Sequence, residues 1–236
     1  MVIRNELAES HNKKWKAHLQ FGFVRLLSAS LVRKMFMQFG ELSEYDNWKR
    51  EKLPSKLFRN REQLWLSLIP SFDDSELVVF EFGVAHGYAT KWWLKHLKPR
   101  NIEWHGFDVF TGLPTPWVRG GIEAYSTGAF DARGQTPQIE DERVFWHVGD
   151  VTQTLPPHSD VGANQPTLFL FDFDLGDPTS FCYSTLKHRI KKGDIFYFDE
   201  AFDAWNERRV ISEQIMRDFS LKSLGSTATA LAFQID

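Results

Sequence analysis

The 236-residue sequence has a single cysteine, no long apolar run and no large excess of one charge. Cys182 alone cannot form an internal disulfide or a zinc cluster, which favours a reducing, cytoplasmic compartment. The 28 Lys and Arg residues against 31 Asp and Glu give a net charge of −3. This charge gives no general electrostatic reason to bind nucleic acid or an anionic membrane. We therefore expect a small molecule as the partner.

Membrane spans and export signals are also missing from the pattern. No run approaches the roughly 18 consecutive apolar residues of a membrane span, and the polar N-terminus lacks the apolar core of a secretory signal. Residues 19–39 come nearest, but Arg25, Arg33 and Lys34 interrupt them. They predict an amphipathic helix that packs on the domain or on a second subunit, rather than on a membrane. The oligomeric state stays open, with the aromatic-rich N-terminal helices as candidates for the contact in a homodimer.

Aromatic residues are plentiful, with 21 Phe and 9 Trp, and the pattern changes near residue 71. Residues 1–70 carry apolar residues such as Leu31 and Met35 at helical spacing and predict a helical extension or cap. Residues 71–236 predict one α/β domain, because apolar runs alternate with helical stretches as in a parallel sheet covered on both faces. The runs are LVVFEF (77–82), IEWHGFDVF (102–110), RVFWHVGD (143–150), PTLFLFDFD (166–174) and GDIFYFDE (193–200).

Two further features complete this organisation. The last two runs, around 221–226 and 229–236, leave no room for a helix between them and predict an antiparallel hairpin at a sheet edge. The segment 111–142, rich in Gly, Pro, Thr and Ser, is too long for a routine connection and predicts a lid or substrate loop. An ordinary surface excursion is the alternative.

Ligands of open α/β sheets bind beyond the carboxyl ends of the strands, so the residues that end each run are candidates. The first run ends in Glu81 and a turn from Gly83 to Gly87, which lacks the dinucleotide fingerprint GxGxxG. Glycines let the backbone approach a ligand closely. The carboxylate of Glu81 repels a phosphate and attracts the ammonium of an amino-acid ligand.

The next two runs also end in acids. Asp108 is placed to accept hydrogen bonds from ribose hydroxyls, with a helix cap or turn residue as the alternative. Gly149 and Asp150 end the third run, where small side chains leave space for an adenine edge and Asp150 can accept from its amine. Asp150 is equally suited to N-cap the following helix.

Carboxylates gather at the ends of the fourth and fifth runs, where Asp172, Asp174, Asp177, Asp199 and Glu200 are found. Such clustering is costly unless a cation balances it. Oxygen ligands suit a hard cation such as Mg²⁺, which we expect here. The alternative is that these acids cap helices or pair with Arg208 and Arg209.

The segments EFGVAHG, GFDVFTGLPTPW, VGDVTQTLP, LFLFDFDLGDPTS and GDIFYFDEAF, in this order, resemble the macrocin O-methyltransferase-like (TylF-like) family of class I S-adenosylmethionine-dependent methyltransferases. The resemblance covers residues 77–236. It implies a Rossmann-like, seven-stranded, mostly parallel sheet with an antiparallel C-terminal hairpin and helices on both faces. It also implies S-adenosylmethionine at the first three strand ends and Mg²⁺ at the next two. Leu175, Gly176 and Asp177 stand where the family commonly has a Tyr, which puts the substrate class in doubt.

The resemblance transfers roles by position. Asp172, Asp199 and Glu200 match the metal ligands, while Asp172 and Asp174 are the candidate catalytic residues, with Asp174 as the proton acceptor. The weaker suggestions His86, His105, His147 and Trp117 receive no role. The candidate cofactor-binding residues are Glu81, Gly83, Val84, Ala85, Gly87, Thr90, Asp108, Val109, Phe110, Gly149, Asp150, Val151 and Asp172.

The expected activity is transfer of a methyl group from S-adenosylmethionine to a hydroxyl of a small molecule, such as a sugar or natural product, with magnesium assistance. Two alternatives stay open. One is a metal-dependent nucleotide-sugar glycosyltransferase that uses the Asp172-x-Asp174 pair. The other is a catalytically inert protein that binds S-adenosylmethionine.

Overall fold

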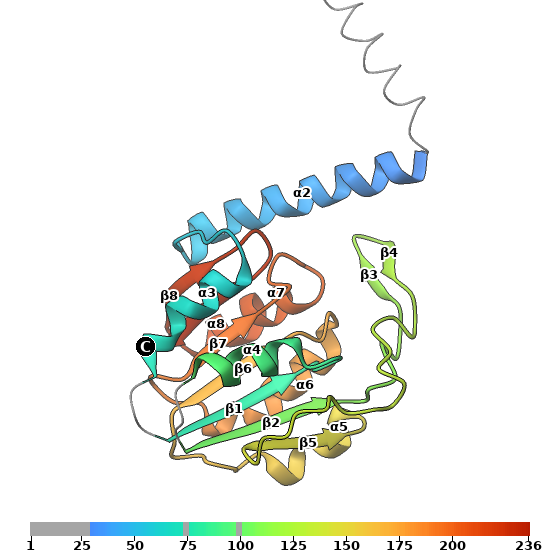
Figure 1. Cartoon of the computed structure of the whole chain (residues 1–236). Coiled ribbons are helices and arrows are strands. Elements are labelled where there is room, and N and C mark those ends of the chain that lie inside the picture. Colours follow the sequence, from blue (N-terminus) through green and yellow to red (C-terminus); the bar gives the residue numbers. More distant parts are fainter. Residues whose placement is uncertain (1–28, 73–75, 98–100) are drawn as a thin grey trace, which may run out of the picture. The chain divides into compact units, whose positions relative to one another are not determined.

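The computed structural model describes residues 29–72, 76–97 and 101–236 (Figure 1). The chain divides into two units between Gly40 and Glu41, and helix α2 (Ala29–Lys52) crosses this division. The predicted amphipathic helix over 19–39 is thus helical in its described part, whereas residues 19–28 lie outside the described residues. Among the residues that the structure describes, no helix is both long and apolar enough to cross a membrane.

A seven-stranded sheet forms the centre of the second unit, in the order β5-β2-β1-β6-β7-β9-β8. Every predicted apolar run forms a strand, and the final two form the predicted antiparallel edge hairpin. The other strands are parallel to their neighbours. The bounds are β1 Leu77–Phe82, β2 Ile102–Asp108, β5 Val144–Val148, β6 Thr167–Phe171, β7 Ile195–Phe198, β8 Leu221–Ser226 and β9 Leu231–Ile235.

The order reverses between β1 and β6, since the chain moves outward from β1 to β2 and β5 and then returns to β6 and β7. Phe82 of β1 is in register with Phe107 of β2 and Phe171 of β6. The three strands therefore end side by side, and the crevice beyond this reversal is where open α/β sheets bind ligands.

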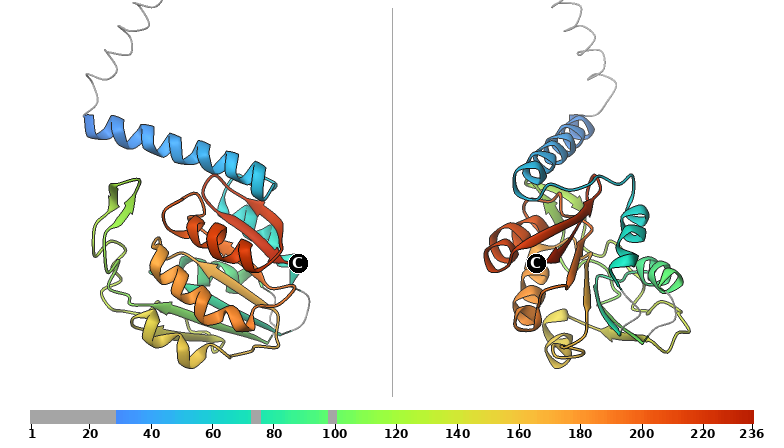
Figure 2. Two further views of the ribbon diagram at one scale, coloured as in Figure 1. Left: turned by 180° about the vertical axis from the view of Figure 1, so that it is seen from behind. Right: turned by 90° about the vertical axis from the view of Figure 1, so that its left-hand side faces the viewer.

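Helices cover both faces of the sheet (Figure 2). Core residues of α3 and α4 pack on one face, and those of α5, α6, α7 and the helical turn after it pack on the other. The bounds are α3 Arg61–Leu68, η1 Ile69–Ser71, α4 Tyr88–His96, α5 Val151–Thr154, η2 Pro156–His158, α6 Gly176–Leu186, η3 Lys187–Arg189, α7 Glu207–Val210, the π-helical η4 Ile211–Ile215 and α8 Met216–Asp218.

The many phenylalanines form one face of the sheet. Phe80, Phe169, Phe196 and Phe233 belong to neighbouring strands, and their ring centroids are 5.7, 4.6 and 5.4 Å apart in that order. Strand residues alternate between faces, so this ladder lies under α5 to α8. Stacked rings combine large buried area with favourable ring geometry, which explains the aromatic-rich composition as core.

The segment 111–142 is not a structureless loop. It contains the hairpin of β3 (Trp117–Arg119) and β4 (Ile122–Tyr125), which Figure 1 shows beyond the strand ends. Gly120 and Gly121 form its two-residue turn with φ of 52° and 77°. Two consecutive positive φ values fit the turn that joins tightly paired strands, where glycine is favoured.

Residues 41–70 are part of the same unit as the sheet, although the sequence pattern places them with the N-terminal extension. The Tyr45 hydroxyl donates to the Ala230 carbonyl at 2.9 Å. Leu64 and Trp65 of α3 are buried in the core, and Leu57 pairs with Ser226 beside β8. The role of residues 1–70 as a separate cap stays a prediction.

Candidate functional site

A cavity of about 710 Å³ opens at the carboxyl ends of β1, β2, β5, β6 and β7. Its volume lies within the range of ligand-binding clefts. Most of the predicted site residues line it together: Glu81, Gly83, Val84, Ala85, Asp108, Val109, Gly149, Asp150, Val151, Asp172, Asp174, Asp199 and Glu200. Gly87, Thr90 and Phe110 are buried and are not among the residues that line the cavity.

The turn after β1 requires glycine for two separate reasons. Gly83 has a φ of 84°, and a Cβ atom there would lie 2.0 Å from the carbonyl oxygen of Asp172. Gly87 has a φ of 72° and precedes α4, where a Cβ atom would lie 2.7 Å from Pro137. Positive φ is strained for other residues. The turn therefore holds the ends of β1 and β6 in close approach.

Asp108 organises this turn. Its Oδ2 accepts from the backbone N–H groups of Val84 and Ala85, both at 2.8 Å, and its Oδ1 accepts from that of Phe110 at 2.7 Å. A carboxylate has about four acceptor positions, so roughly one remains for a ligand. Asp108 acts as a turn residue in the structure, and its ribose contact stays a prediction with that one position to use.

Glu81 is fully buried at the end of β1. Its Oε2 accepts from the Thr90 hydroxyl at 2.5 Å and from the Trp104 indole N–H at 2.7 Å. Burial raises the pKa of Glu81 to about 7, although both hydrogen bonds oppose the rise. Thr90 is thus a support for Glu81 rather than part of the cavity wall. Near neutral pH, a carboxyl with this pKa binds a proton, or is ionised by a cationic ligand group that lies beside it.

Asp150 fills the alternative role that the sequence left open. It N-caps α5, because its side chain accepts from the Thr152 N–H at 2.8 Å. It also lines the cavity, so the adenine contact stays a prediction that this cap does not oppose.

Phe110, another predicted cofactor-binding residue, is buried and packs edge-on against Trp146, with ring centroids 6.1 Å apart.

The acids at the ends of β6 and β7 form one cluster, defined by Asp172, Asp174, Asp199 and Glu200. Burial, followed by the charges of the neighbouring acids, raises the pKa of Asp172 and Glu200 far above the ordinary value and that of Asp174 to about 7. Asp174 is 6 % exposed and has a φ of 62°. The cluster therefore attracts a positive charge.

The predicted magnesium ligands do not form a metal site in this arrangement. The hydroxyl of Tyr197 donates to Oδ1 of Asp199, and Nη1 of Arg61 lies 3.2 Å from Oδ2. Within the described ranges, no group of three His, Cys, Asp or Glu side chains is spaced to hold an ion. With Asp199 held in this way, the predicted ligands as placed do not meet the near-octahedral geometry that Mg²⁺ demands. Its presence stays a prediction.

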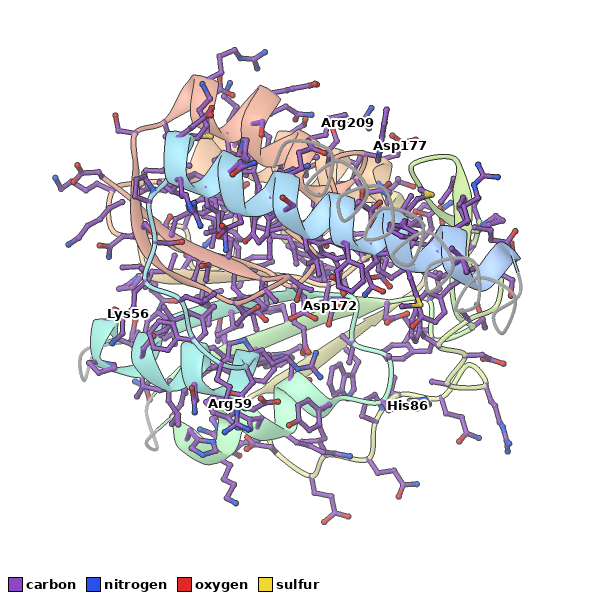
Figure 3. The ribbon with its side chains drawn as sticks, turned by 90° about the horizontal axis from the view of Figure 1, so that it is seen from above. Lys56, Arg59, His86, Asp172, Asp177 and Arg209 are labelled. Atoms are coloured by element: carbon purple, nitrogen blue, oxygen red, sulfur yellow. The ribbon has the colours of Figure 1, made fainter. Side chains whose placement is uncertain are left out.

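The ion pairs with Arg208 and Arg209, considered from the sequence, involve other acids. Arg209 pairs with Asp177 at 3.2 Å, and Arg208 pairs with Glu44 at 3.0 Å. Figure 3 shows Arg209 and Asp177 side by side, apart from Asp172. Arg61 of α3 pairs with Asp199 of the acid cluster, and the charge of Arg119 in β3 opposes the rise in the pKa of Asp174 and Glu200. Sequence reasoning missed Arg61 because nothing local links α3 to the end of β7.

The hairpin β3–β4 supplies an aromatic wall that the sequence analysis did not assign. Trp117 and Tyr125 of the hairpin line the cavity together with Phe130, which follows β4. The rings of Trp117 and Tyr125 stack at 5.5 Å. The Trp117 indole N–H donates to Asp203 at 2.8 Å, which fixes the hairpin to the segment after β7. The Gly-Gly turn was the available sequence signal for this element.

The histidines separate into two places. His86 lines the cavity, together with Trp117, and its side chain is exposed. Figure 3 shows His86 apart from Asp172. His105 and His147 lie outside the cavity wall, with Nδ1 of His105 3.0 Å from Nε2 of His147. Neither of these two is placed to act on a ligand in the cavity.

Comparison with solved structures identifies the fold. A structure of the calicheamicin methyltransferase CalS11 matches with a TM-score of 0.55 and 21 % identity, over 88 % of this chain and 93 % of that one. An apo structure of CalS11, described as a TDP-rhamnose 3'-O-methyltransferase, gives 0.50 and 21 % over 89 % and 98 %. The O-methyltransferase NovP gives 0.48 and 19 % over 74 % and 77 %.

No protein-family model and no curated sequence matches the chain. The likeness to CalS11 shows that the chain has a Rossmann-like methyltransferase fold. Membership of the macrocin O-methyltransferase-like family stays a prediction.

Proposed function

We propose that the chain is an S-adenosylmethionine-dependent O-methyltransferase that acts on a hydroxyl of a small molecule. The observation that carries this proposal is the buried carboxyl of Glu81 beside the Gly83 turn, at the reversal point of the sheet. Glu81 is the partner for the cofactor ammonium, Asp108 for the ribose and Asp150 for the adenine amine. Acidic side chains at these strand ends oppose a pyrophosphate and favour a cationic cofactor.

Methyl transfer is an in-line displacement. The bond from the methyl carbon to sulfur breaks as the bond to the acceptor oxygen forms, and S-adenosylhomocysteine leaves as a neutral thioether. The hydroxyl proton passes to the Asp174 carboxylate, which lines the cavity between β6 and the aromatic wall. Asp172 stabilises the positive sulfonium before transfer, because the bound cation favours the ionised carboxylate that burial opposes in the empty site. In this mechanism no metal takes part at Asp199, because Arg61 and Tyr197 hold its carboxylate.

The acceptor we propose is a hydroxyl of a sugar or of a sugar-bearing natural product. The aromatic wall of Trp117, Tyr125 and Phe130 beside acidic groups suits a ligand with both an apolar face and hydroxyls. CalS11, a TDP-rhamnose 3'-O-methyltransferase with a similar fold, supports the same class of acceptor.

The test begins with ligand binding, by thermal unfolding with S-adenosylhomocysteine and, separately, with a nucleotide diphosphate sugar. We expect S-adenosylhomocysteine to stabilise the folded protein, by about 2.7 kcal/mol at a hundredfold excess over its dissociation constant. Stabilisation by the nucleotide sugar alone would point to the glycosyltransferase instead.

Turnover separates an enzyme from an inert binder. Labelled S-adenosylmethionine is supplied with a panel of sugar hydroxyl acceptors. We expect product from the wild type and a fall in kcat of about 10²- to 10⁴-fold for Asp174→Asn, with unchanged binding of S-adenosylhomocysteine. The control is Asp160→Asn, which removes the charge of a side chain that is 81 % exposed. This variant should leave kcat unaltered. Binding without turnover on any acceptor would leave only the inert protein.

A further inference from the structure

We infer that Arg61 is a positioning residue that takes the place of a divalent cation at the acid cluster, so that methyl transfer by this chain needs no metal. The catalytic part of this inference rests on the proposed function. The binding part, that Arg61 excludes a divalent ion from Asp199, stands on the geometry alone.

Local structure fixes where Arg61 points. Arg61 is the first residue of α3, and the Asn60 side chain caps this helix by accepting from the Gln63 N–H at 3.0 Å. The guanidinium lies over two rings, 5.3 Å from the centroid of Trp65 and 4.9 Å from that of Tyr88. Because arginine stacks on aromatic faces, these contacts hold the guanidinium against the cavity wall.

The same guanidinium is the cation that contacts the acid cluster directly, at Asp199, whereas Arg119 acts on Asp174 and Glu200 through its charge. Nη1 of Arg61 lies 3.2 Å from Oδ2 of Asp199, and Tyr197 donates to the other oxygen. Arg61 is the one Lys or Arg side chain among the described residues that line the cavity. The acids on that wall are Glu81, Asp108, Asp150, Asp172, Asp174, Asp177, Asp199 and Glu200.

A divalent ion and Arg61 compete for one carboxylate. An ion bound by Asp199 would either displace the guanidinium from its carboxylate or lie beside it, and two positive groups side by side repel each other at partly buried positions. The Asp199 side chain is only 13 % exposed, so solvent screens this repulsion incompletely. Arg61 therefore holds Asp199 in place and supplies positive charge to the cluster. Unlike a metal ion, it has no bound waters that a substrate could replace.

The binding test uses Mn²⁺ as the probe and electron paramagnetic resonance as the readout, on the full chain. We expect the wild type and Asp199→Asn to bind Mn²⁺ alike, because Arg61 already occupies the carboxylate. Arg61→Gln should gain at least about tenfold in Mn²⁺ affinity, whereas Arg61→Lys, which keeps the charge but not the stacked plane, should gain less.

A matched control is Arg59→Gln. Arg59 is exposed two residues earlier in the chain and lies apart from Asp172 in Figure 3, so its loss should leave Mn²⁺ affinity unchanged. Wild-type Mn²⁺ binding that Asp199→Asn abolishes would overturn the inference. If Arg61→Gln does not fold, the Mn²⁺ affinities of the wild type and Asp199→Asn still test whether Asp199 binds a divalent ion.

The catalytic test compares binding of S-adenosylhomocysteine and turnover with and without a chelator. We expect neither to change in the wild type, and we expect Arg61→Gln to lower kcat more than it raises KM for the cofactor, with partial rescue by Arg61→Lys. Loss of turnover in the chelator with retained cofactor binding would overturn the inference and leave the proposed function intact. Absence of cofactor binding in both conditions would remove the proposed function, while the Mn²⁺ result would still stand.

Discussion

At the scale of single residues, Glu81 couples ligand binding to pH. Burial raises its pKa to about 7, so the empty site holds a proton below that pH and must release it to face an ammonium. The affinity for S-adenosylhomocysteine should therefore fall by about tenfold for each pH unit below 7 and level off above it. Isothermal titration calorimetry between about pH 5.5 and 8.5 measures this profile.

The variant Glu81→Gln isolates the residue responsible. It should lose at least about tenfold in affinity at about pH 8, where the wild type is a carboxylate, and its profile should be flat. Glu213→Gln alters an exposed acid of η4 and should retain the wild-type profile. An unchanged slope in Glu81→Gln would assign the proton to another group.

Gly83 and Gly193 separate backbone strain from steric clash. Both have positive φ, 84° and 96°, but a Cβ atom would meet the Asp172 carbonyl oxygen at 2.0 Å only at Gly83, since Gly193 has open space around it. Gly193→Ala should cost about 1–3 kcal/mol of unfolding free energy from strain. Gly83→Ala should cost clearly more, measured by urea denaturation. Equal losses would show that the end of β6 moves freely away from the turn.

The site illustrates which residues a sequence can assign. Glu81, Asp108 and Asp172 were found because they end apolar runs, and parallel strands all end at one side of the sheet. The three N–H donors on Asp108 could not be foreseen, since they depend on the conformation of two loops. Arg61 precedes the sheet in the chain and meets Asp199 only through tertiary packing, so no local pattern marks it.

At the scale of elements, the strands were predictable because buried parallel strands are continuous apolar runs. The predicted fourth run continues to residue 174, whereas β6 ends at Phe171. The chain leaves the sheet there, and Asp174 adopts a left-handed φ. Polarity alone does not mark that change. The β3–β4 hairpin is short and half-exposed, so its apolar pattern is weak and only Gly120 and Gly121 indicate it.

Strands β2 and β5 carry a titratable cluster behind the site. His105 and His147 are 3.0 Å apart, and the His158 ring of η2 lies 4.0 Å from that of His147. Burial, then the charges of neighbouring histidines, lowers the pKa of His105 and His147 to about 4, and Arg189 contributes at His105. Glu103 lies 3.7 Å from Nε2 of His105. The folded protein thus holds both rings neutral at pH 7.

The stability of the fold should therefore depend on these rings in acid. A depressed histidine pKa stabilises the folded state above about pH 6.5, and this contribution is lost as pH falls toward 4. The urea midpoint of the wild type should drop over this window, and His147→Phe should reduce the drop. The control is His188→Gln, because His188 is a half-exposed surface residue that pairs with Asp160. Its urea midpoint should fall with pH as that of the wild type does. If the urea midpoints of the wild type, His147→Phe and His188→Gln fall equally with pH, the acid sensitivity belongs to other groups.

At the scale of the whole molecule, the sheet and the segment before it form one folding unit. The Lys49 ammonium lies 3.3 Å from the Ser226 hydroxyl, and the backbone N–H of Phe58 donates to the Ser226 carbonyl at 2.7 Å. The segment thus connects to both the far strand of the sheet and, through Arg61, the cavity. A functional boundary near residue 70 would cut through these contacts.

Two truncated chains test this directly. A chain of residues 71–236 lacks Tyr45, Leu64, Trp65 and Leu68, all fully buried. Loss of one such side chain typically costs 2–5 kcal/mol, against a total stability of about 5–15 kcal/mol. We expect residues 71–236 to show no cooperative thermal unfolding by circular dichroism. A chain of residues 41–236 keeps every one of those side chains and should unfold cooperatively, with stabilisation by S-adenosylhomocysteine. A folded, ligand-binding chain of residues 71–236 would instead establish residues 1–70 as a dispensable cap.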